Sequence, residues 1–171
     1  MNFYYWLGYH LSRLLARLFF GFRIIHRERV IPTGPVILAM NHQSFFDPPL
    51  AGNACDRPIF FLAKKSLMNV PVLGWLLPKL NVIPVNLEGG DRSALKALIR
   101  ILSAGDCALV FPEGSRTPDG NLHPALPGLG LLITLTGTIL RVCHERQVSL
   151  GIGFCSIAYR FLEALLGRLG N

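Results

Sequence analysis

The sequence of 171 residues has little acidic charge: 10 Asp and Glu stand against 17 Lys and Arg, which gives a formal net charge of +7. Only 16% of the residues are charged and 51% are hydrophobic, a composition that excludes a disordered chain. A basic, apolar protein is expected to act at an anionic membrane surface or on a substrate that carries phosphate. Nucleic acid is not expected as a partner, because the sequence has no basic helix, aromatic stacking motif or zinc knuckle.

Cysteine is also scarce, and no two cysteines have C-x-x-C spacing. The four thiols are therefore expected to be reduced, mostly packed in the interior, and in a cytosolic compartment: Cys55, Cys107, Cys143 and Cys155. A zinc site made by Cys143, His144 and Cys155 would match no standard ligand spacing, so no metal is expected.

Internal repeats, low-complexity tracts and linkers are absent as well. The N-terminus has neither a basic first region nor an A-x-A site, so a cleavable signal is not expected. At this length the sequence predicts one domain that covers residues 1–171.

Residues 1–28 are predicted to form an amphipathic helix and not a membrane span, because three arginines interrupt the apolar run. His10, Arg13 and Arg17 recur at i, i+3 and i+7, which makes a basic stripe. The other side is apolar and the start is aromatic: Leu7, Leu11, Leu14, Leu15, Leu18 and Phe22, with Tyr4, Tyr5 and Trp6. This pattern is typical of a helix that lies in the membrane interface. The alternative is a surface helix that packs on its own domain.

Four short apolar runs are predicted to be buried strands: residues 35–40, 57–65, 81–86 and 106–114. Pro84 suggests that the third run is an edge strand or a strand end. Between the third and fourth runs, apolar residues recur at i, i+3, i+4 and i+7, with Asp91 or Ser93 as helix cap: Leu95, Leu98, Ile99 and Leu102. Strand, helix and strand at this spacing indicate an α/β fold with parallel pairs.

Two later stretches are also expected to be helical. The uncharged run from Gly120 to Leu140 is long enough to span a bilayer, but its prolines and glycines favour a buried helix instead. That helix is predicted from about Gly128 to Thr136 and ends at Gly137. The apolar pattern of residues 154–169 predicts a final amphipathic helix.

The stretch "NHQSFFDPP", residues 41–49, places His42 and Asp47 five residues apart directly after a predicted strand. On a continuous helix they would point roughly 140° apart, so the chain must turn between them. The prolines at 48 and 49 favour a helix start, which would put Asp47 at the N-cap and His42 in the loop. A loop that folds back would bring the carboxylate to one imidazole nitrogen and leave the other for general-base chemistry.

The alternative interpretation of this stretch is structural, with Asp47 as a plain helix cap and His42 as a loop residue. A serine nucleophile at Ser44 is disfavoured, because a G-x-S-x-G elbow is absent.

A second stretch, "FPEGSR" (residues 111–116), follows an apolar run and places Glu113 and Arg116 in a turn that contains Gly114. Arg116 is suited to hold a phosphate through charge-assisted hydrogen bonds, helped by backbone amides near Gly114. A turn with one salt bridge is the alternative.

Together and in this order, the two stretches resemble the glycerolipid acyltransferases of the lysophosphatidate acyltransferase (PlsC-like) family. "NHQSFFD" is similar to the family block N-H-x-x-x-x-D, and "FPEGSR" is similar to F-P-E-G-[TS]-R. The segments "FFLAKKSLMNVPVLGWLLPKLNVIPVN" and "GGDRSALKALIRIL" between them also resemble family sequence. The resemblance covers residues 30–137.

This resemblance implies a mixed, largely parallel α/β sheet flanked by helices and held on the cytoplasmic face of a membrane by the N-terminal helix. It also implies transfer of a fatty acyl group from acyl-CoA or acyl carrier protein to 1-acylglycerol-3-phosphate (lysophosphatidate), which gives phosphatidate for phospholipid biosynthesis. Because a thioester is already activated, the reaction would need no cofactor, metal or covalent enzyme intermediate.

In this reaction His42 would take the proton from the attacking hydroxyl, while Asp47 would fix the imidazole tautomer and stabilise the imidazolium. The residues that would bind the acceptor phosphate come from the second stretch: Glu113, Gly114, Ser115 and Arg116.

The sequence departs from the family pattern at Leu87, where an arginine usually helps to bind the acceptor phosphate. Arg92 is expected to take its place, and Lys64 and Lys65 are further candidates. Arg141 stands where the proline of a V-P-V-like strand is expected, and residues 138–171 carry no recognisable family sequence. A diverged tail, a truncated protein or a shifted reading frame would look like this.

Two functions therefore stay open. The first is a membrane-bound acyltransferase, for lysophosphatidate or for a different lysolipid or ornithine-type acceptor. The second is a catalytically weak or inactive membrane protein that binds phospholipid.

Overall fold

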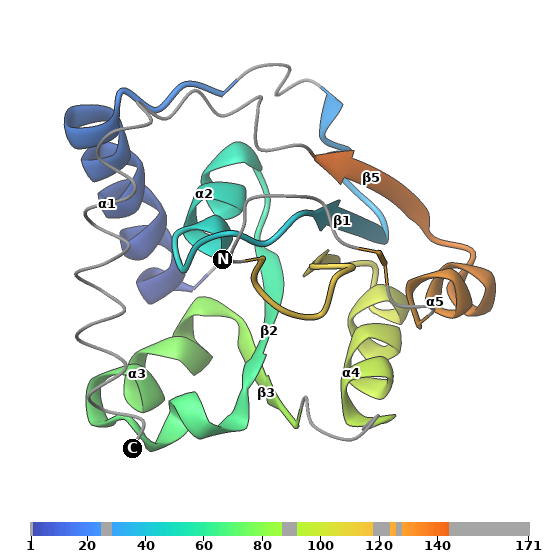
Figure 1. Cartoon of the computed structure of the whole chain (residues 1–171). Helices are drawn as coiled ribbons and strands as arrows, with labels where there is room; N and C mark the ends of the chain where they lie inside the picture. Colours follow the sequence, from blue (N-terminus) through green and yellow to red (C-terminus); the bar gives the residue numbers. More distant parts are fainter. Residues whose placement is uncertain (1, 25–28, 87–91, 118–123, 126–127, 144–171) are drawn as a thin grey trace.

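The structure is a computed structural model that describes residues 2–24, 29–86, 92–117, 124–125 and 128–143. Figure 1 shows the elements in chain order: α1 (Phe3–Phe20), β1 (Val36–Met40), α2 (Asp47–Ala54), β2 (Ile59–Lys64), the 3₁₀ helix η2 (Lys65–Asn69), α3 (Pro71–Leu76), the 3₁₀ helix η3 (Leu77–Leu80), β3 (Val82–Val85), α4 (Arg92–Ser103), β4 (Cys107–Val110), α5 (Gly128–Thr136) and β5 (Ile139–Cys143).

Five strands form one sheet in the order β3-β2-β4-β1-β5, and every pairing described is parallel. The predicted α/β fold with a largely parallel sheet is therefore confirmed. Pro84 lies in β3 at the edge of the sheet, where its missing N–H costs no ladder hydrogen bond. All five residues of β1 are buried, as expected for a central strand covered on both faces.

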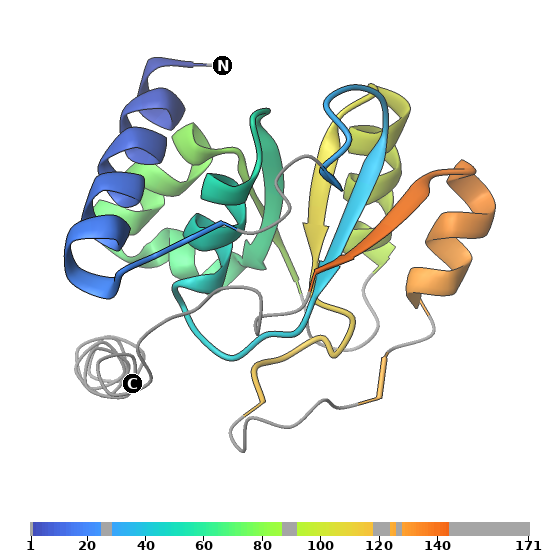
Figure 2. The same ribbon diagram turned by 90° about the horizontal axis from the view of Figure 1, so that it is seen from above.

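Helices cover both faces of this sheet, so the molecule has three layers (Figure 2). Successive side chains of a strand point to opposite faces, and β1 shows this clearly. Val36 and Leu38 pack in a core with residues of α1 and α2, whereas Ile37 packs with residues of α4 and α5. Cys55 and Cys107 are buried and form no disulfide bond, as predicted. The side chain of Cys143 and all of Cys155 lie outside the described residues.

The helices of the second half agree with their predictions where they are described. α4 begins at Arg92, with Ser93 in its first turn, and Asp91 lies outside the described residues. α5 covers Gly128–Thr136 as predicted and is followed by Gly137 with φ +59°, a left-handed conformation that ends helices. The helix predicted for residues 154–169 lies outside the described residues.

α1 is shorter than the 28 residues predicted, because Gly21 adopts a left-handed conformation (φ +57°) and ends the helix after Phe20. Residues 25–28 lie outside the described part. Within the residues that the structure describes, no helix has both the length and the apolar content needed to cross a membrane.

α1 contacts the domain through tyrosines and small residues. The hydroxyl of Tyr5 accepts a hydrogen bond from the backbone N–H of Ile59 at 3.0 Å. Ser12 Oγ donates to Asn53 Oδ1 of α2 at 3.3 Å. Helix and domain also approach closely at Gly8, where an added Cβ would lie 3.0 Å from Leu80 Cδ2.

The opposite side of α1 is apolar and exposed, and we call it the exposed apolar side of α1. Its members are 42–69% exposed: Phe3, Trp6, Leu7, Leu11, Leu14, Leu15, Leu18 and Phe19. As the alternative of a surface helix predicts, α1 packs on its own domain, but it does so through side chains such as Tyr5 and Ala16 and leaves its leucines exposed. The membrane-interface role of these leucines stays a prediction. Phe22, which we expected on the leucine side, follows the helix and is buried.

Candidate active site

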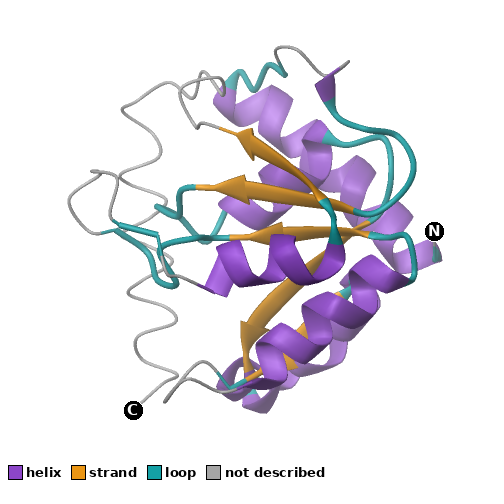
Figure 3. Cartoon of the chain, turned by 90° about the vertical axis from the view of Figure 1, so that its right-hand side faces the viewer, coloured by secondary structure: helices purple, strands orange, loops and turns teal. Residues whose placement is uncertain are grey.

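The two motif stretches follow neighbouring strands. β1 ends at Met40 and β4 at Val110, and the two strands pair in parallel. Residues that follow parallel neighbours leave the sheet at the same edge, so the stretches 41–47 and 111–117 form two adjacent loops. Figure 3 shows these loops at the left of the molecule, beyond the strand arrowheads. We call them the first and second loops.

A histidine–carboxylate pair forms within the first loop. His42 Nδ1 lies 2.7 Å from Asp47 Oδ2, so the loop folds back as the general-base interpretation requires. The side chain of Asp47 is 3% exposed and that of His42 is 19% exposed. Among the described residues nothing is bonded to His42 Nε2, which leaves this nitrogen for a substrate proton.

Backbone amides fix the carboxylate of Asp47. Its Oδ2 accepts hydrogen bonds from the N–H groups of Gln43 and Ser44, each at 2.8 Å, in addition to the contact with His42. Ser44 Oγ accepts from the N–H of Phe46 at 3.1 Å, which tightens the same loop. A carboxylate held by several donors has little freedom to rotate away from the imidazole, so the pair is preorganised.

The prediction that Asp47 is the N-cap of the following helix is wrong. Phe46 is the N-cap without a side-chain hydrogen bond, and Asp47 is the first residue of α2. The physical reason lies in the next two residues. Pro48 and Pro49 have no N–H groups, so a carboxylate at this position has few helix amides to cap and binds the loop amides instead.

The second loop makes a tight turn. The N–H of Gly114 donates to the carbonyl oxygen of Phe111 at 3.0 Å, Pro112 follows Phe111, and Gly114 has φ +74°. Proline at the second position and a residue with positive φ at the end suit such a turn. Because the amide of Gly114 is used inside the turn, this glycine shapes the loop.

The second loop also holds both backbone groups of His42. The N–H of His42 donates to Glu113 Oε2 at 3.4 Å. The carbonyl oxygen of His42 accepts from the N–H of Thr117 at 2.8 Å and from its Oγ1 at 3.3 Å. Glu113, predicted as a phosphate-binding residue, is thus placed where it holds the first loop against the second.

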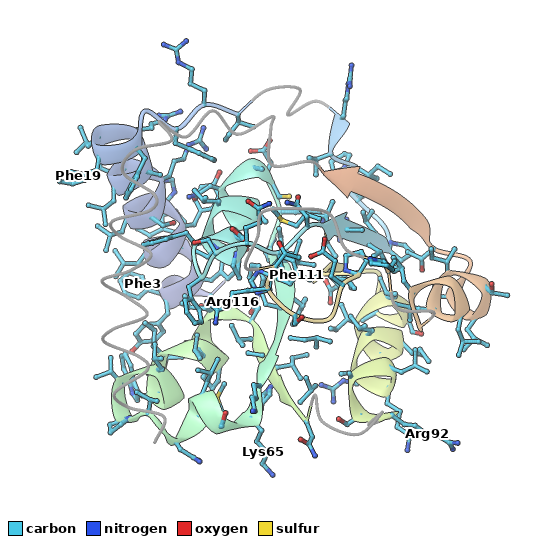
Figure 4. The ribbon with its side chains drawn as sticks, viewed as in Figure 1. Phe3, Phe19, Lys65, Arg92, Phe111 and Arg116 are labelled. Atoms are coloured by element: carbon cyan, nitrogen blue, oxygen red, sulfur yellow. The ribbon has the colours of Figure 1, made fainter. Side chains whose placement is uncertain are left out.

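Each loop places an aromatic ring against a charged or titratable side chain of the other. Phe111 stacks on the imidazole of His42, with ring centroids 3.8 Å apart and an interplanar angle of 15°. Arg116 Cζ lies 3.9 Å from the centroid of Phe45. Phe111 and Arg116 lie close together near the middle of Figure 4.

The structure thus brings most predicted site residues together: His42, Asp47, Glu113, Gly114, Ser115 and Arg116. It does not bring Arg92 to them, because Arg92 begins α4 and lies at the lower rim of Figure 4, well apart from Arg116. Lys65 also points outward at this rim. Leu87 lies outside the described residues.

Sequence reasoning missed three residues of the site, namely Phe45, Phe111 and Thr117. All three lie within or directly after the two motifs, and for the two phenylalanines the available signal was an aromatic residue inside a polar motif. No group of three or more His, Cys, Asp or Glu side chains that could hold a metal occurs in the described part of the chain.

Comparison with known proteins gives a consistent result. The family model "Acyltransferase" matches residues 22–144, which include both loops and β5 and extend beyond residue 137. The sequence is 29% identical over 105 residues to the chloroplastic 1-acyl-sn-glycerol-3-phosphate acyltransferase BAT2 of Brassica napus, which covers 60% of this chain and 30% of that protein. It is 33% identical over 114 residues to the lyso-ornithine lipid O-acyltransferase of Pseudomonas aeruginosa, with 66% and 42% covered.

The fold is also similar to a solved structure. The crystal structure of the 1-acyl-sn-glycerophosphate acyltransferase PlsC from Thermotoga maritima matches with a TM-score of 0.67 and 28% sequence identity. The match covers 80% of this chain and 55% of that one. The chain thus spans less than two thirds of the length of the relatives described here.

Proposed function

Because the chain belongs to the acyltransferase family, we propose that it transfers a fatty acyl group from a thioester to the free hydroxyl of lysophosphatidate. The observation that carries the proposal is the contact of His42 Nδ1 with Asp47 Oδ2 at 2.7 Å, beside the turn that holds Arg116. The names of the relatives support the acceptor, since most of those that match are 1-acyl-sn-glycerol-3-phosphate acyltransferases. The donor is acyl-CoA or acyl carrier protein, and no cofactor is needed.

In the proposed reaction the acceptor hydroxyl attacks the thioester carbonyl while His42 Nε2 takes its proton. The proton on Nδ1 stays hydrogen-bonded to Asp47, whose charge stabilises the imidazolium. The tetrahedral intermediate then collapses, the carbon–sulfur bond breaks, and the imidazolium returns the proton to the thiolate. The products are the new ester and a free thiol, and His42 is again neutral.

The second loop positions His42 and the acceptor for this reaction. Glu113 and Thr117 fix the backbone of His42, and the parallel stack with Phe111 holds its ring in one orientation. Arg116 binds the acceptor phosphate through charge-assisted hydrogen bonds, with the exposed Ser115 beside it. The phosphate and the reacting hydroxyl would then be held by loops that are bonded to each other.

The proposal includes a location on the cytoplasmic face of a membrane, bound at the surface, because acceptor and product are lipids. The exposed apolar side of α1 would enter the interface. α3 adds Val72 and Trp75, which are 71% and 57% exposed. Lys79 Nζ lies 3.3 Å from the ring centroid of Trp75 and 4.2 Å from that of Tyr4. Lysine and aromatic side chains are typical of the level of the lipid head groups.

An ornithine-type acceptor is the second candidate, supported by the 33% identity to the lyso-ornithine lipid O-acyltransferase. An ornithine head group presents a carboxylate and an amine in place of phosphate. Arg116 is able to pair with a carboxylate as well as with a phosphate. The separation of Arg92 from Arg116 in Figure 4 favours an acceptor that needs a single arginine.

The deciding experiment measures thiol release from a long-chain acyl-CoA, and then from the acyl carrier protein thioester, on mixed vesicles. Lysophosphatidate is compared with lyso-ornithine lipid and with lysophosphatidylcholine, and the His42→Ala variant is the control. We expect the fastest release with lysophosphatidate and almost none from the variant. Faster release with lyso-ornithine lipid would select the second candidate. No release with any pair would indicate a phospholipid-binding protein without turnover.

A further inference from the structure

Phe45 lies three residues after His42 and belongs to neither the histidine–carboxylate pair nor the anion-binding turn. Its ring nevertheless lies under the guanidinium of Arg116, with Cζ 3.9 Å from the ring centroid. This distance is well within the about 6 Å over which a cation is attracted by an aromatic face. Arg116 and Phe45 thus form a contact between the two loops that the reaction scheme above does not use.

The position of Phe45 is set by its neighbours. Ser44 is held through its N–H by Asp47, and Phe46 is held through its N–H by Ser44 Oγ, so the backbone is anchored on both sides of residue 45. Arg116, in contrast, has a long side chain and follows two exposed residues, Gly114 and Ser115. Fixing a long arginine side chain in one geometry costs rotamer entropy. A fixed aromatic face lowers this cost at the moment of binding.

We propose that Phe45 is a positioning residue for Arg116 and thereby determines the preference for acceptors with an anionic head group. The inference rests on the proposed acyl transfer and refines its acceptor site. Stacking on an aromatic ring leaves the N–H donors at the edge of the planar guanidinium, where they can form paired hydrogen bonds with an anion. Because Phe45 and His42 share one rigid loop, the ring also sets the distance between the bound anion and the general base.

The test uses the full chain on vesicles with acyl-CoA as donor and two acceptors. Lysophosphatidate carries the phosphate, and monoacylglycerol with the same acyl chain has none. We expect Phe45→Leu to raise KM for lysophosphatidate roughly 2- to 30-fold, the range of a cation–π contact, and to change kcat less than about 3-fold. KM for monoacylglycerol should not change, and Phe45→Tyr, which keeps the ring, should restore KM for lysophosphatidate.

Phe60→Leu is the matched control, because Phe60 is half-buried in β2 and packs in the core between the sheet and helices α4 and α5. It should leave both KM values unchanged. Phe45→Met keeps the apolar volume without a ring and replaces the leucine variant if that variant does not fold. Calorimetric binding of lysophosphatidate in detergent micelles gives the same comparison without turnover.

Equal effects of Phe45→Leu on both acceptors, or a loss confined to kcat, would show that the ring only supports the loop, and the inference would be wrong. The proposed function would stand in that case, because wild-type thiol release would continue. A wild-type protein that binds lysophosphatidate but releases no thiol would remove the proposed function. The calorimetric binding of lysophosphatidate to wild type and to Phe45→Leu would then test the role of Phe45 independently of turnover.

Discussion

α1 and α4 are both amphipathic helices of this chain, yet they face the domain with opposite sides. α4 buries its apolar side chains Leu98, Ile101 and Leu102 against the sheet and exposes Lys96 and Arg100. α1 exposes its apolar side and contacts the domain through tyrosines, a glycine and a serine. An amphipathic pattern therefore predicts that a helix has an apolar side, and does not tell whether the domain covers that side.

The difference separates two kinds of contribution to the protein. The apolar side of α4 stabilises the fold, because it is removed from water when the chain folds. The exposed apolar side of α1 gains little from folding, and in the proposed function it contacts a lipid surface. Contiguous exposed apolar surface of this kind marks interaction sites in folded proteins. Four measurements test this difference between the two helices.

The largest effect is expected from a change in the first loop, outside both helices. His42→Ala should lower kcat by about 10²- to 10⁴-fold, the contribution of general-base catalysis, and should leave vesicle binding unchanged. Thiol release and co-sedimentation with vesicles on the same preparations check this. If both fell together, docking by α1 and chemistry at the first loop would not be separable.

Core truncation should distinguish the helices by stability. Leu98→Ala in α4 should lower the free energy of unfolding by about 2–5 kcal/mol, because it leaves a cavity beside the sheet. Leu11→Ala in α1 should change it by less than about 0.5 kcal/mol, because Leu11 is 51% exposed. Urea unfolding followed by circular dichroism measures both. A cost at Leu11 that matches the cost at Leu98 would contradict the contrast.

Vesicle binding should respond to changes on the exposed apolar side of α1 and not to changes outside α1. Leu11→Asp combined with Leu18→Asp should weaken binding to vesicles that contain anionic lipid by roughly 10- to 100-fold, since two apolar groups would no longer enter the interface. Ser103→Asp combined with Ser66→Asp adds the same charge at exposed positions outside α1 and serves as the control. Equal losses in both pairs would show that net charge, and not the exposed apolar side of α1, governs binding.

The smallest effect concerns the attachment of α1. Tyr5→Phe should cost about 1–3 kcal/mol near pH 8, because the buried N–H of Ile59 loses its acceptor. Burial raises the pKa of Tyr5 from 10.0 to about 12. The folded protein therefore keeps this proton at a pH where the unfolded chain has lost it, so the stability linked to Tyr5 is complete below pH 10 and is lost as the pH rises towards 12.

The unfolding free energies of wild type and Tyr5→Phe should thus converge as the pH rises from 10 to 12. Unfolding curves at a series of pH values between 8 and 12 check this. A constant difference across the range would show that Tyr5 does not keep its proton in the folded state.

Much of the fold could be predicted because the strands are short apolar runs. The run 57–65 contains β2 at Ile59–Lys64, and the run 106–114 contains β4 at Cys107–Val110. The pair of His42 and Asp47 could also be predicted, since it depends on residues within one loop and on the prolines that follow. Local information was sufficient for these features.

Other features depend on contacts between distant parts of the chain. The side of α1 that faces the domain is decided by partners such as Ile59, which is 54 residues from Tyr5. The contact between Phe45 and Arg116 requires β1 and β4 to be neighbours, which no local pattern specifies. The shift of the N-cap to Phe46 has a local cause, because Pro48 and Pro49 offer no backbone N–H groups for Asp47 to cap.

The hold of the second loop on His42 has a consequence for folding kinetics. The groups that bind the backbone of His42 are 71 and 75 residues away in sequence, so they meet only after β4 has paired with β1. Closing such a long segment is slow compared with the formation of α1 or α4, which depends on local contacts. During refolding, helical circular dichroism should therefore return before thiol release does. Activity regained over time then measures the rate at which the two halves of the chain come together.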